Sequence, residues 1–245
     1  MGAVILISIL HRMGIIDSLI RRRAAAMSKR PKTIQGIYNI MKNIDVRRVT
    51  DPTSHVDVTA CMEEMNKLTL EDVGLHPQLL KTVKDNMCMT ICSTPTFNMA
   101  VFLVGPGKRL PLHDHPNMIV LSRLLHGTCH VSSFTPKDPT ALHRNNSNAS
   151  SILYNREVVA KTPSDATWCL SPTISNFHEL RSEGVSILFD VLMPPYDESE
   201  QRPCNYYAPE AVGEAWRLLP VAEPTKELPY SVEYRGDMPE EEWGI

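Results

Sequence analysis

The sequence is poor in glycine and lacks any apolar run long enough to cross a membrane. It has 11 glycines against 19 prolines in 245 residues, and 42% of its residues are hydrophobic, a composition that excludes collagen-like and disordered chains. The apolar run at residues 3–10 contains Ser8 and ends before His11 and Arg12, whereas a membrane-spanning helix needs about 18 apolar residues. We therefore expect a globular protein of one or two domains without a membrane span.

Phosphate-binding and structural-zinc motifs are also missing. No G-x-G-x-x-G or G-x-x-x-x-G-K-[ST] segment occurs, which excludes the usual phosphate-binding turns of nucleotide-binding α/β folds. The six cysteines include no C-x-x-C pair, so no structural zinc site is indicated. Scattered thiols of this kind are typical of a reducing compartment, and we expect the protein in the cytoplasm.

Positive charge is concentrated at the amino end of the chain. Residues 1–50 hold ten Lys or Arg against two Asp, a net charge of +8, which leaves −11 for the other 195 residues because the whole chain carries −3. Nucleic acids are bound by clustered Lys and Arg, and the chain after residue 50 has no such cluster, so we expect no nucleic-acid partner. Residues 1–30 form a basic N-terminal extension whose apolar, arginine-rich start would suit mitochondrial targeting or a segment lying on a surface.

Helical patterning is confined to residues 31–90. Thr33 and Thr59 are expected N-caps of two amphipathic helices, and Thr69 with Asp72 predicts a further short turn through a capping box. We therefore predict a helical N-terminal region packed on the main domain. The apolar stripes that predict the two helices recur at intervals of three and four and consist of Ile34, Ile37, Tyr38, Met41 and Ile44, followed by Cys61, Met65 and Leu68.

From about residue 90 the pattern changes to short β-rich runs separated by Gly, Pro and Asn. Runs of this kind, spaced about ten residues apart, predict a mainly β sandwich or barrel over residues 91–245. The tail after Tyr196 is acidic, and residues 209–219 have a helix-like pattern. The predicted runs are 97–104, 118–125, 128–134, 151–154, 157–161, 167–170, 177–181 and 185–193.

The most informative segment is GKRLPLHDHP at residues 107–116. Side chains on one face of a strand recur every second residue, so His113 and His115 are expected on one face of a strand, where two imidazoles can bind one metal. His178, which precedes the apolar run 185–193, is the best candidate for a third ligand. Three such ligands on one side of a metal leave open positions for other molecules.

Gly107, five further residues and the pair His113-x-His115 resemble the first motif of the cupin superfamily. That resemblance implies a metal at the centre of a small jelly-roll-like barrel, the double-stranded β-helix. The cupin motif continues with a Glu ligand and then a Gly. Here Gly127 is in register, but Val120 stands at the position of the Glu. Thiol dioxygenases are a cupin family that lacks this carboxylate and binds iron through three histidines.

Three motifs within residues 60–210 are similar to the cysteamine dioxygenase and plant cysteine oxidase family. The resemblance implies a cupin-type fold behind N-terminal helices, Fe(II) as the cofactor, and His113, His115 and His178 as its ligands. The substrates that it implies are O₂ and either cysteamine or the N-terminal cysteine of a peptide. The motifs are PLHDHP at 111–116, DVLMPPYD at 190–197 and CNYY at 204–207.

The same resemblance assigns four further residues to the active site. Asp190 and Tyr196 are implied near the substrate pocket, and Cys204 and Tyr206 match positions that a thioether joins in some family members. We expect Asp190 to orient the substrate amine or a neighbouring group. Tyr196 is expected to donate its hydroxyl to the bound oxygen or substrate, or else only to pack.

Three neutral imidazoles suit this chemistry because they leave the charge of Fe(II) uncompensated, so that a thiolate is a favourable further ligand. Both oxygen atoms of O₂ then end on sulfur as a sulfinic acid. We predict a monomeric Fe(II)-dependent thiol dioxygenase, and oxidation of a peptide's N-terminal cysteine would mark it for oxygen-dependent N-degron degradation. Two alternatives remain: a three-histidine zinc hydrolase or hydratase, and a non-enzymatic cupin binding module.

Overall fold

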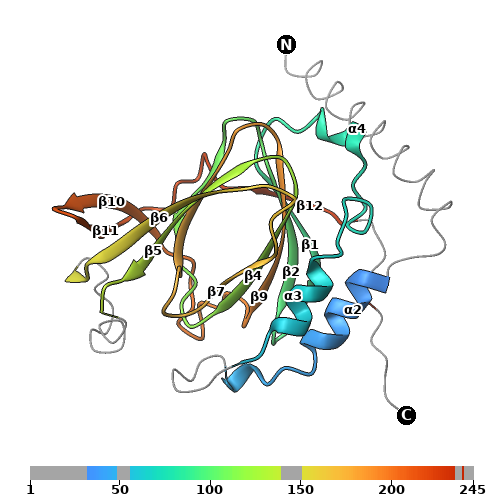
Figure 1. The fold of residues 1–245 in the computed structure, drawn as a ribbon, viewed down its shortest axis with the longest axis horizontal. Helices are drawn as coiled ribbons and strands as arrows, with labels where there is room; N and C mark the ends of the chain where they lie inside the picture. The colour runs from blue at the N-terminus through green and yellow to red at the C-terminus, as the bar shows by residue number, and fades with distance from the viewer. Residues whose placement is uncertain (1–31, 49–55, 139–150, 235–238, 240–245) are drawn as a thin grey trace.

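The protein is described by a computed structural model that covers residues 32–48, 56–138, 151–234 and 239. Two β-sheets surround a common interior, and Figure 1 shows the molecule along the axis of this barrel. The predicted basic extension at residues 1–30 lies outside the described residues. In the described part of the chain, no helix is long and apolar enough to span a membrane.

The N-terminal helices lie against the outside of the barrel, as predicted (Figure 1). Their apolar residues pack on the outward face of one sheet in the largest hydrophobic cluster of the protein. The capping box between Thr69 and Asp72 forms, with the Thr69 backbone N–H donating to the Asp72 carboxylate at 2.9 Å, and it opens a turn. The helical elements are α2 (Lys32–Met41), η1 (Val46–Arg48), α3 (Thr59–Met65) and α4 (Pro77–Leu80).

One sheet has six strands in the order β12-β1-β2-β9-β4-β7. The helices cover its outer face, and its inner face looks into the barrel, so both faces of its central strands are buried. The strands are β12 (Tyr230–Val232), β1 (Met87–Ser93), β2 (Asn98–Val104), β9 (Ser186–Met193), β4 (Ile119–His126) and β7 (Trp168–Leu170).

The other sheet closes on itself in the order β10-β11-β6-β5-β8-β3. Closure comes from β10, which pairs with β11 and also meets β3 at the Tyr206–His113 pair. Two sheets enclosing one apolar interior form the double-stranded β-helix, so the predicted mainly β fold with N-terminal helices is confirmed. The strands are β10 (Tyr206–Val212), β11 (Ala215–Val221), β6 (Tyr154–Lys161), β5 (Cys129–Pro136), β8 (Phe177–Ser182) and β3 (Arg109–His113).

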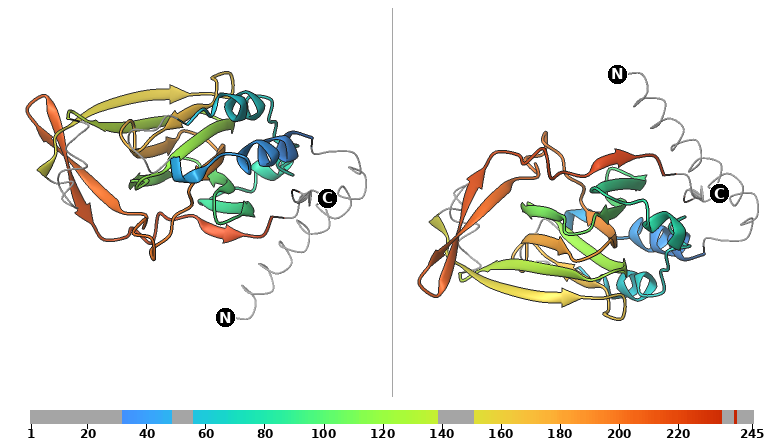
Figure 2. Two further views of the ribbon diagram at one scale, coloured as in Figure 1. Left: turned by 90° about the horizontal axis from the view of Figure 1, so that it is seen from below. Right: turned by 90° about the horizontal axis from the view of Figure 1, so that it is seen from above.

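Most predicted runs coincide with strands, but the region after Tyr196 differs from the prediction. The helix-like pattern at residues 209–219 was wrong, because this segment forms most of the antiparallel hairpin β10–β11. Figure 2 shows this hairpin at the end of the molecule away from α2 and α3. Leu218 is fully buried against Phe134 and Tyr154, so packing on distant strands overrides the local pattern. The run 157–161 lies within strand β6, but of the run 151–154 only Tyr154 belongs to a strand, and that strand is also β6.

Strand β9 is buried along its whole length, and its two faces pack in different hydrophobic clusters. Phe189 and Val191 pack toward the helices, whereas Leu188 and Leu192 belong to clusters inside the barrel. Successive side chains of a strand point to opposite faces, so Asp190 faces the barrel interior. On the inward face of β9, a single carboxyl group therefore lies between the apolar side chains of Leu188 and Leu192.

We expect Phe189→Ala to lower the free energy of unfolding by about 3–5 kcal/mol, since it removes a fully buried ring between the helices and the sheet. Val158→Ala on β6 is the control, because Val158 is 55% exposed and should change stability by less than about 0.5 kcal/mol. Urea denaturation followed by circular dichroism measures both. Similar losses for the two variants would contradict this assignment of the core.

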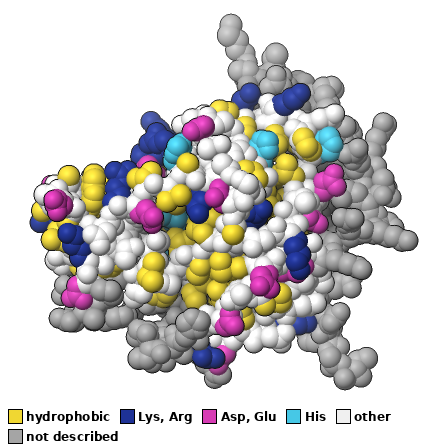
Figure 3. Space-filling view, in the orientation of Figure 1, with side chains coloured by type: hydrophobic (Ala, Val, Ile, Leu, Met, Phe, Trp, Pro, Cys, Tyr) yellow, Lys and Arg dark blue, Asp and Glu magenta, His cyan; other side chains and the backbone are white. Residues whose placement is uncertain are grey.

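The surface shows no large area of one charge on the face along the barrel axis. Lys and Arg side chains alternate there with Asp and Glu, and apolar side chains gather near the centre (Figure 3). Elsewhere in the described chain, Arg109 and Glu227 form an ion pair at 2.6 Å, and Arg109 also pairs with Glu179 at 2.8 Å. These pairs link β3 and β8 to the segment before β12.

Candidate metal centre

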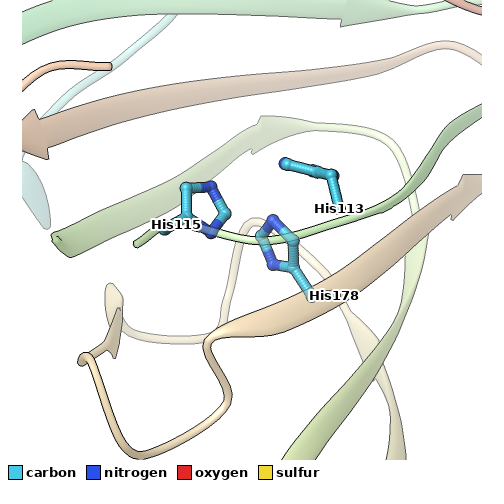
Figure 4. Close-up of side chains that lie close together, drawn as sticks. All are labelled: His113, His115 and His178. Atoms are coloured by element: carbon cyan, nitrogen blue, oxygen red, sulfur yellow. The ribbon is translucent and has the colours of Figure 1, made fainter. Parts of the chain in front are cut away.

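Three histidines converge inside the barrel. His113 ends β3 and pairs across to His178 near the start of β8, and His115 follows two residues after β3. Their ring centroids lie 4.7–4.9 Å apart, and one nitrogen of each ring lies within 4.8 Å of the others. Figure 4 shows the three rings turned toward one another. Sequence spacing predicted the pair His113 and His115, the family resemblance implied His178 as the third ligand, and the structure brings the three together.

One detail of the prediction was wrong: His113 and His115 do not share a strand. Strand β3 ends at His113, and Asn176 then holds the loop. The Asn176 carboxamide oxygen accepts from the His115 backbone N–H at 3.0 Å, and its amide donates to the His115 carbonyl at 2.8 Å. Sequence reasoning missed Asn176, and its only signal was a polar residue two positions before His178.

The hydrogen bonds of the ring nitrogens decide which nitrogen is free to bind a metal. Nδ1 of His113 lies 2.7 Å from the Pro111 carbonyl, and Nδ1 of His115 lies 3.0 Å from the Asn176 carbonyl. A carbonyl only accepts, so both Nδ1 atoms carry the proton and leave the Nε2 lone pairs available. Nδ1 of His178 is buried and has no hydrogen-bond partner among the described residues.

All three imidazoles are neutral in this environment. Burial lowers the pKa of His113, lowers that of His178 well below its ordinary range, and together with the neighbouring His113 lowers that of His115 to about 3. Neutral nitrogen donors without a carboxylate fit a divalent Fe or Zn ion. Val120, at the position of the cupin Glu, is fully buried among Met118 and other apolar residues.

Asp190 lies on β9 opposite Ser122 of β4, and Ser122 in turn lies opposite Trp168 of β7. The Oδ1 atom of Asp190, the Oγ of Ser122 and the Nε1 of Trp168 are buried and have no hydrogen-bond partner among the described residues. Burial raises the pKa of Asp190 to about 7. The barrel therefore holds a carboxyl group that can be either charged or neutral near neutral pH.

Tyr196 packs directly on the histidine cluster. Its ring stacks on that of His115 with centroids 5.6 Å apart, and its hydroxyl donates to the Asp114 carbonyl at 2.7 Å. The Asp114 carboxylate accepts from the Tyr207 hydroxyl at 2.8 Å and from the Asn205 backbone N–H at 2.9 Å. Asp114 thus links the loop that carries His115 to the start of β10.

Cys204 and Tyr206 lie together at the edge of the cluster. The Cys204 thiol contacts the hydroxyls of both Tyr196 and Tyr206, and burial raises its pKa. The Tyr206 ring centroid is 6.4 Å from that of His113. Cys204 is a free thiol here. Together with Tyr196, these two side chains also line an outer cavity of about 460 Å³.

Comparisons with known proteins match this site. The PCO_ADO family model matches residues 62–240. Human 2-aminoethanethiol dioxygenase is 30% identical over 58% of this chain and 62% of its own length, and plant cysteine oxidase 2 of Arabidopsis thaliana is 25% identical over 71% and 65%. A probable 2-aminoethanethiol dioxygenase of Dictyostelium discoideum is 33% identical over 51% and 56%. The chain thus matches less than two thirds of each relative's length.

Solved structures give weaker likenesses. A cupin superfamily protein from Desulfitobacterium hafniense matches 46% of this chain and 81% of its own, with 11% identity and a TM-score of 0.33. The family assignment rests instead on the family model, which spans well over half of the sequence and includes all three histidines. The chain therefore belongs to the PCO_ADO family, the thiol dioxygenases that include cysteamine dioxygenase and plant cysteine oxidase.

Proposed function

We propose that this protein is an Fe(II)-dependent dioxygenase that converts an amine-bearing thiol, either cysteamine or the N-terminal cysteine of a peptide, to a sulfinic acid. The observation that carries the proposal is the buried group of three neutral histidines without a carboxylate. A site of this charge favours an anionic ligand such as a thiolate. Relatives named as 2-aminoethanethiol dioxygenase and plant cysteine oxidase support the same substrate class.

In the proposed reaction, the histidines, Asp190 and Tyr196 have different roles. His113, His115 and His178 would hold the iron, and a bound iron supplies open positions for thiol and O₂ on one side. Asp190, with a pKa raised to about 7, can accept the thiol proton or orient a neighbouring group. Tyr196 holds the His115 ring in place by stacking on it, and its hydroxyl donates a hydrogen bond to the Asp114 carbonyl.

The reaction balances without a further reductant. One thiol and one O₂ give one sulfinic acid, with both oxygen atoms bonded to sulfur and sulfur supplying four electrons. Val120, Leu170 and Leu192 form one apolar cluster inside the barrel. We further propose that Cys204 and Tyr206, which lie in contact, form the thioether of the family. This bond needs a two-electron oxidant, which O₂, the co-substrate of the proposed reaction, supplies as it is reduced to hydrogen peroxide. The mass of the intact protein would fall by about 2 Da, because the thiol hydrogen and one ring hydrogen are lost.

Incubating the iron-loaded protein with cysteamine, and separately with a peptide that begins with Cys, is expected to add about 32 Da to at least one of them under O₂. Mass spectrometry measures the gain, and anaerobic incubation should abolish it. A protein with one bound iron per chain that oxidises neither thiol would contradict the proposal. Metal analysis in the same samples tests the zinc alternative, which requires zinc and water-dependent activity.

We also propose that the protein acts as a monomer in the cytoplasm. The described chain forms a complete barrel whose closure uses its own β10 and β3, without a second copy. Size-exclusion chromatography with light scattering should give a mass close to 27.6 kDa. A stable dimer at micromolar concentration would contradict this.

A further inference from the structure

The barrel has a gap between β6 and β7. Strand β7 is the end of its sheet, and β6 pairs with β5 along its length but with β11 only at Tyr154. No pairing joins β6 to β7 within the described strands. A cavity of about 180 Å³ lies here and ends on His178. It therefore connects the surface with the metal-binding group.

Apolar and polar side chains share the walls of this cavity. Val131, Val159 and Leu170 line it, and Trp168 carries the Lys161 ammonium 5.4 Å above its ring. Glu157 is the one carboxylate among the lining residues. Glu157 is exposed at this gap and forms no hydrogen bond or ion pair with the described residues, whereas Glu179 and Glu227 both pair with Arg109.

Strand register aims Glu157 at the histidines. Glu157 pairs with Ser133 of β5, and Ser133 pairs with His178 of β8. Paired residues of neighbouring strands project to the same face, so all three side chains point into the barrel. Two strand spacings put about 9–10 Å between the backbones of Glu157 and His178. A small molecule held at the histidines by its sulfur can thus meet Glu157 at its other end.

We propose that Glu157 is the specificity-determining residue that binds the ammonium group of the thiol substrate. The inference rests on the proposed function and deepens it. In cysteamine and in an N-terminal cysteine alike, two carbons separate sulfur from nitrogen, so the ammonium lies a short and constant distance from the metal-bound end. A carboxylate that is unpaired in the free protein forms a charge-assisted hydrogen bond with that ammonium. A thiol without an amine gains nothing from Glu157.

Direct binding tests the proposal without turnover. In protein loaded with redox-inert zinc, calorimetry should give a cysteamine Kd about 5- to 20-fold weaker for Glu157→Gln than for the unaltered protein. The Kd for 2-mercaptoethanol, which lacks the amine, should not change. Glu183→Gln is the matched control, since it removes an exposed carboxylate that contacts His130 at 2.6 Å, outside the cavity.

Turnover gives a second readout and identifies the source of the amine. For the iron-loaded protein, Glu157→Gln should raise KM for the amine-bearing thiol by about the same factor and leave kcat within about twofold. A peptide that begins with Cys and its N-acetylated form make the second arm. If the variant affects only the peptide, the recognised ammonium is the peptide N-terminus; if it affects cysteamine as well, the pocket accepts the free amine.

The inference is overturned if Glu157→Gln binds cysteamine and the Cys peptide as tightly as the unaltered protein does, if it weakens 2-mercaptoethanol equally, or if the zinc-loaded protein binds no thiol. Failure of the proposed function looks different. In that case the zinc-loaded protein binds cysteamine through Glu157, while the iron-loaded protein oxidises no thiol. Glu157→Asp, which keeps the charge on a shorter side chain, should recover part of the lost affinity.

Discussion

Replacing His178 with alanine is expected to abolish thiol oxidation and to weaken metal binding by more than about 100-fold. Changes to groups that merely support a ligand cost 10- to 100-fold in metal affinity, so the loss of one of three ligands should cost at least as much. His178 is 2% exposed and adjoins both other rings. Metal content after dialysis against a fixed free-metal buffer, together with the mass assay, measures the two effects.

The control for this variant is His130→Gln. His130 lies on the neighbouring strand β5, where its ring contacts Glu183 at the surface, and the substitution should leave metal content and turnover unchanged. Because a buried alanine leaves a cavity, His178→Gln serves as a second variant with a similar volume. A His178 variant that still folds and binds one iron with unaltered affinity would show that the three histidines are not the ligand set.

Asp190→Asn is expected to lower kcat/KM by at least about 100-fold while making stability less dependent on pH. The amide keeps the shape of the side chain but cannot accept the thiol proton. Asp190 is 8% exposed, so its carboxyl group is removed from solvent. Steady-state rates of sulfinic acid formation measure the loss, and unchanged rates would remove Asp190 from the mechanism.

The effect of Asp190 on stability has a definite sign. Burial raises its folded-state pKa from 3.8 to about 7, so above pH 4 the folded protein holds a proton that the unfolded chain has released. The contribution to the free energy of unfolding is therefore greatest below about pH 4, falls as pH rises toward 7, and is constant above that. About three pKa units correspond to roughly 4 kcal/mol.

Urea denaturation of the metal-free protein at several pH values checks this sign. The difference in unfolding free energy between the unaltered protein and Asp190→Asn should shift in favour of the variant as pH rises from about 4 to 7. Comparing the two proteins cancels the titration of groups that they share, such as Asp114. A difference that stays constant over this range would mean that Asp190 is ionised in the folded state across it.

The histidine ligands were predictable because their signals are local. His113 and His115 are two residues apart within a motif bounded by Gly107 and Gly127, and both glycines have positive φ in turns. At Gly127 a side chain would collide with the Val185 carbonyl, so the glycine is required there. His178 was predicted from its place before an apolar strand, and β9 follows it as expected.

The hairpin β10–β11 and the contacts of Asn176 could not be predicted in this way. Residues 209–219 have no strand-like signal of their own, and Leu218 finds its partners on β5 and β6, more than fifty residues earlier in the chain. Asn176 positions His115 because the loop after β3 comes within hydrogen-bond distance of its side chain. Such contacts join segments that are far apart in the chain, and local sequence patterns do not show which distant segments meet.

The sequence by itself determined the β-rich architecture, the helices before it, the three imidazoles and the family resemblance, because apolar periodicity and short motifs are local properties of the chain. Only the tertiary structure decided which side chains share the barrel interior. Strand order and register, set by pairing between segments far apart in sequence, put Asp190 in the interior and aim Glu157 at His178 through Ser133. A shift of one residue in either strand would turn those carboxyl groups to the opposite face.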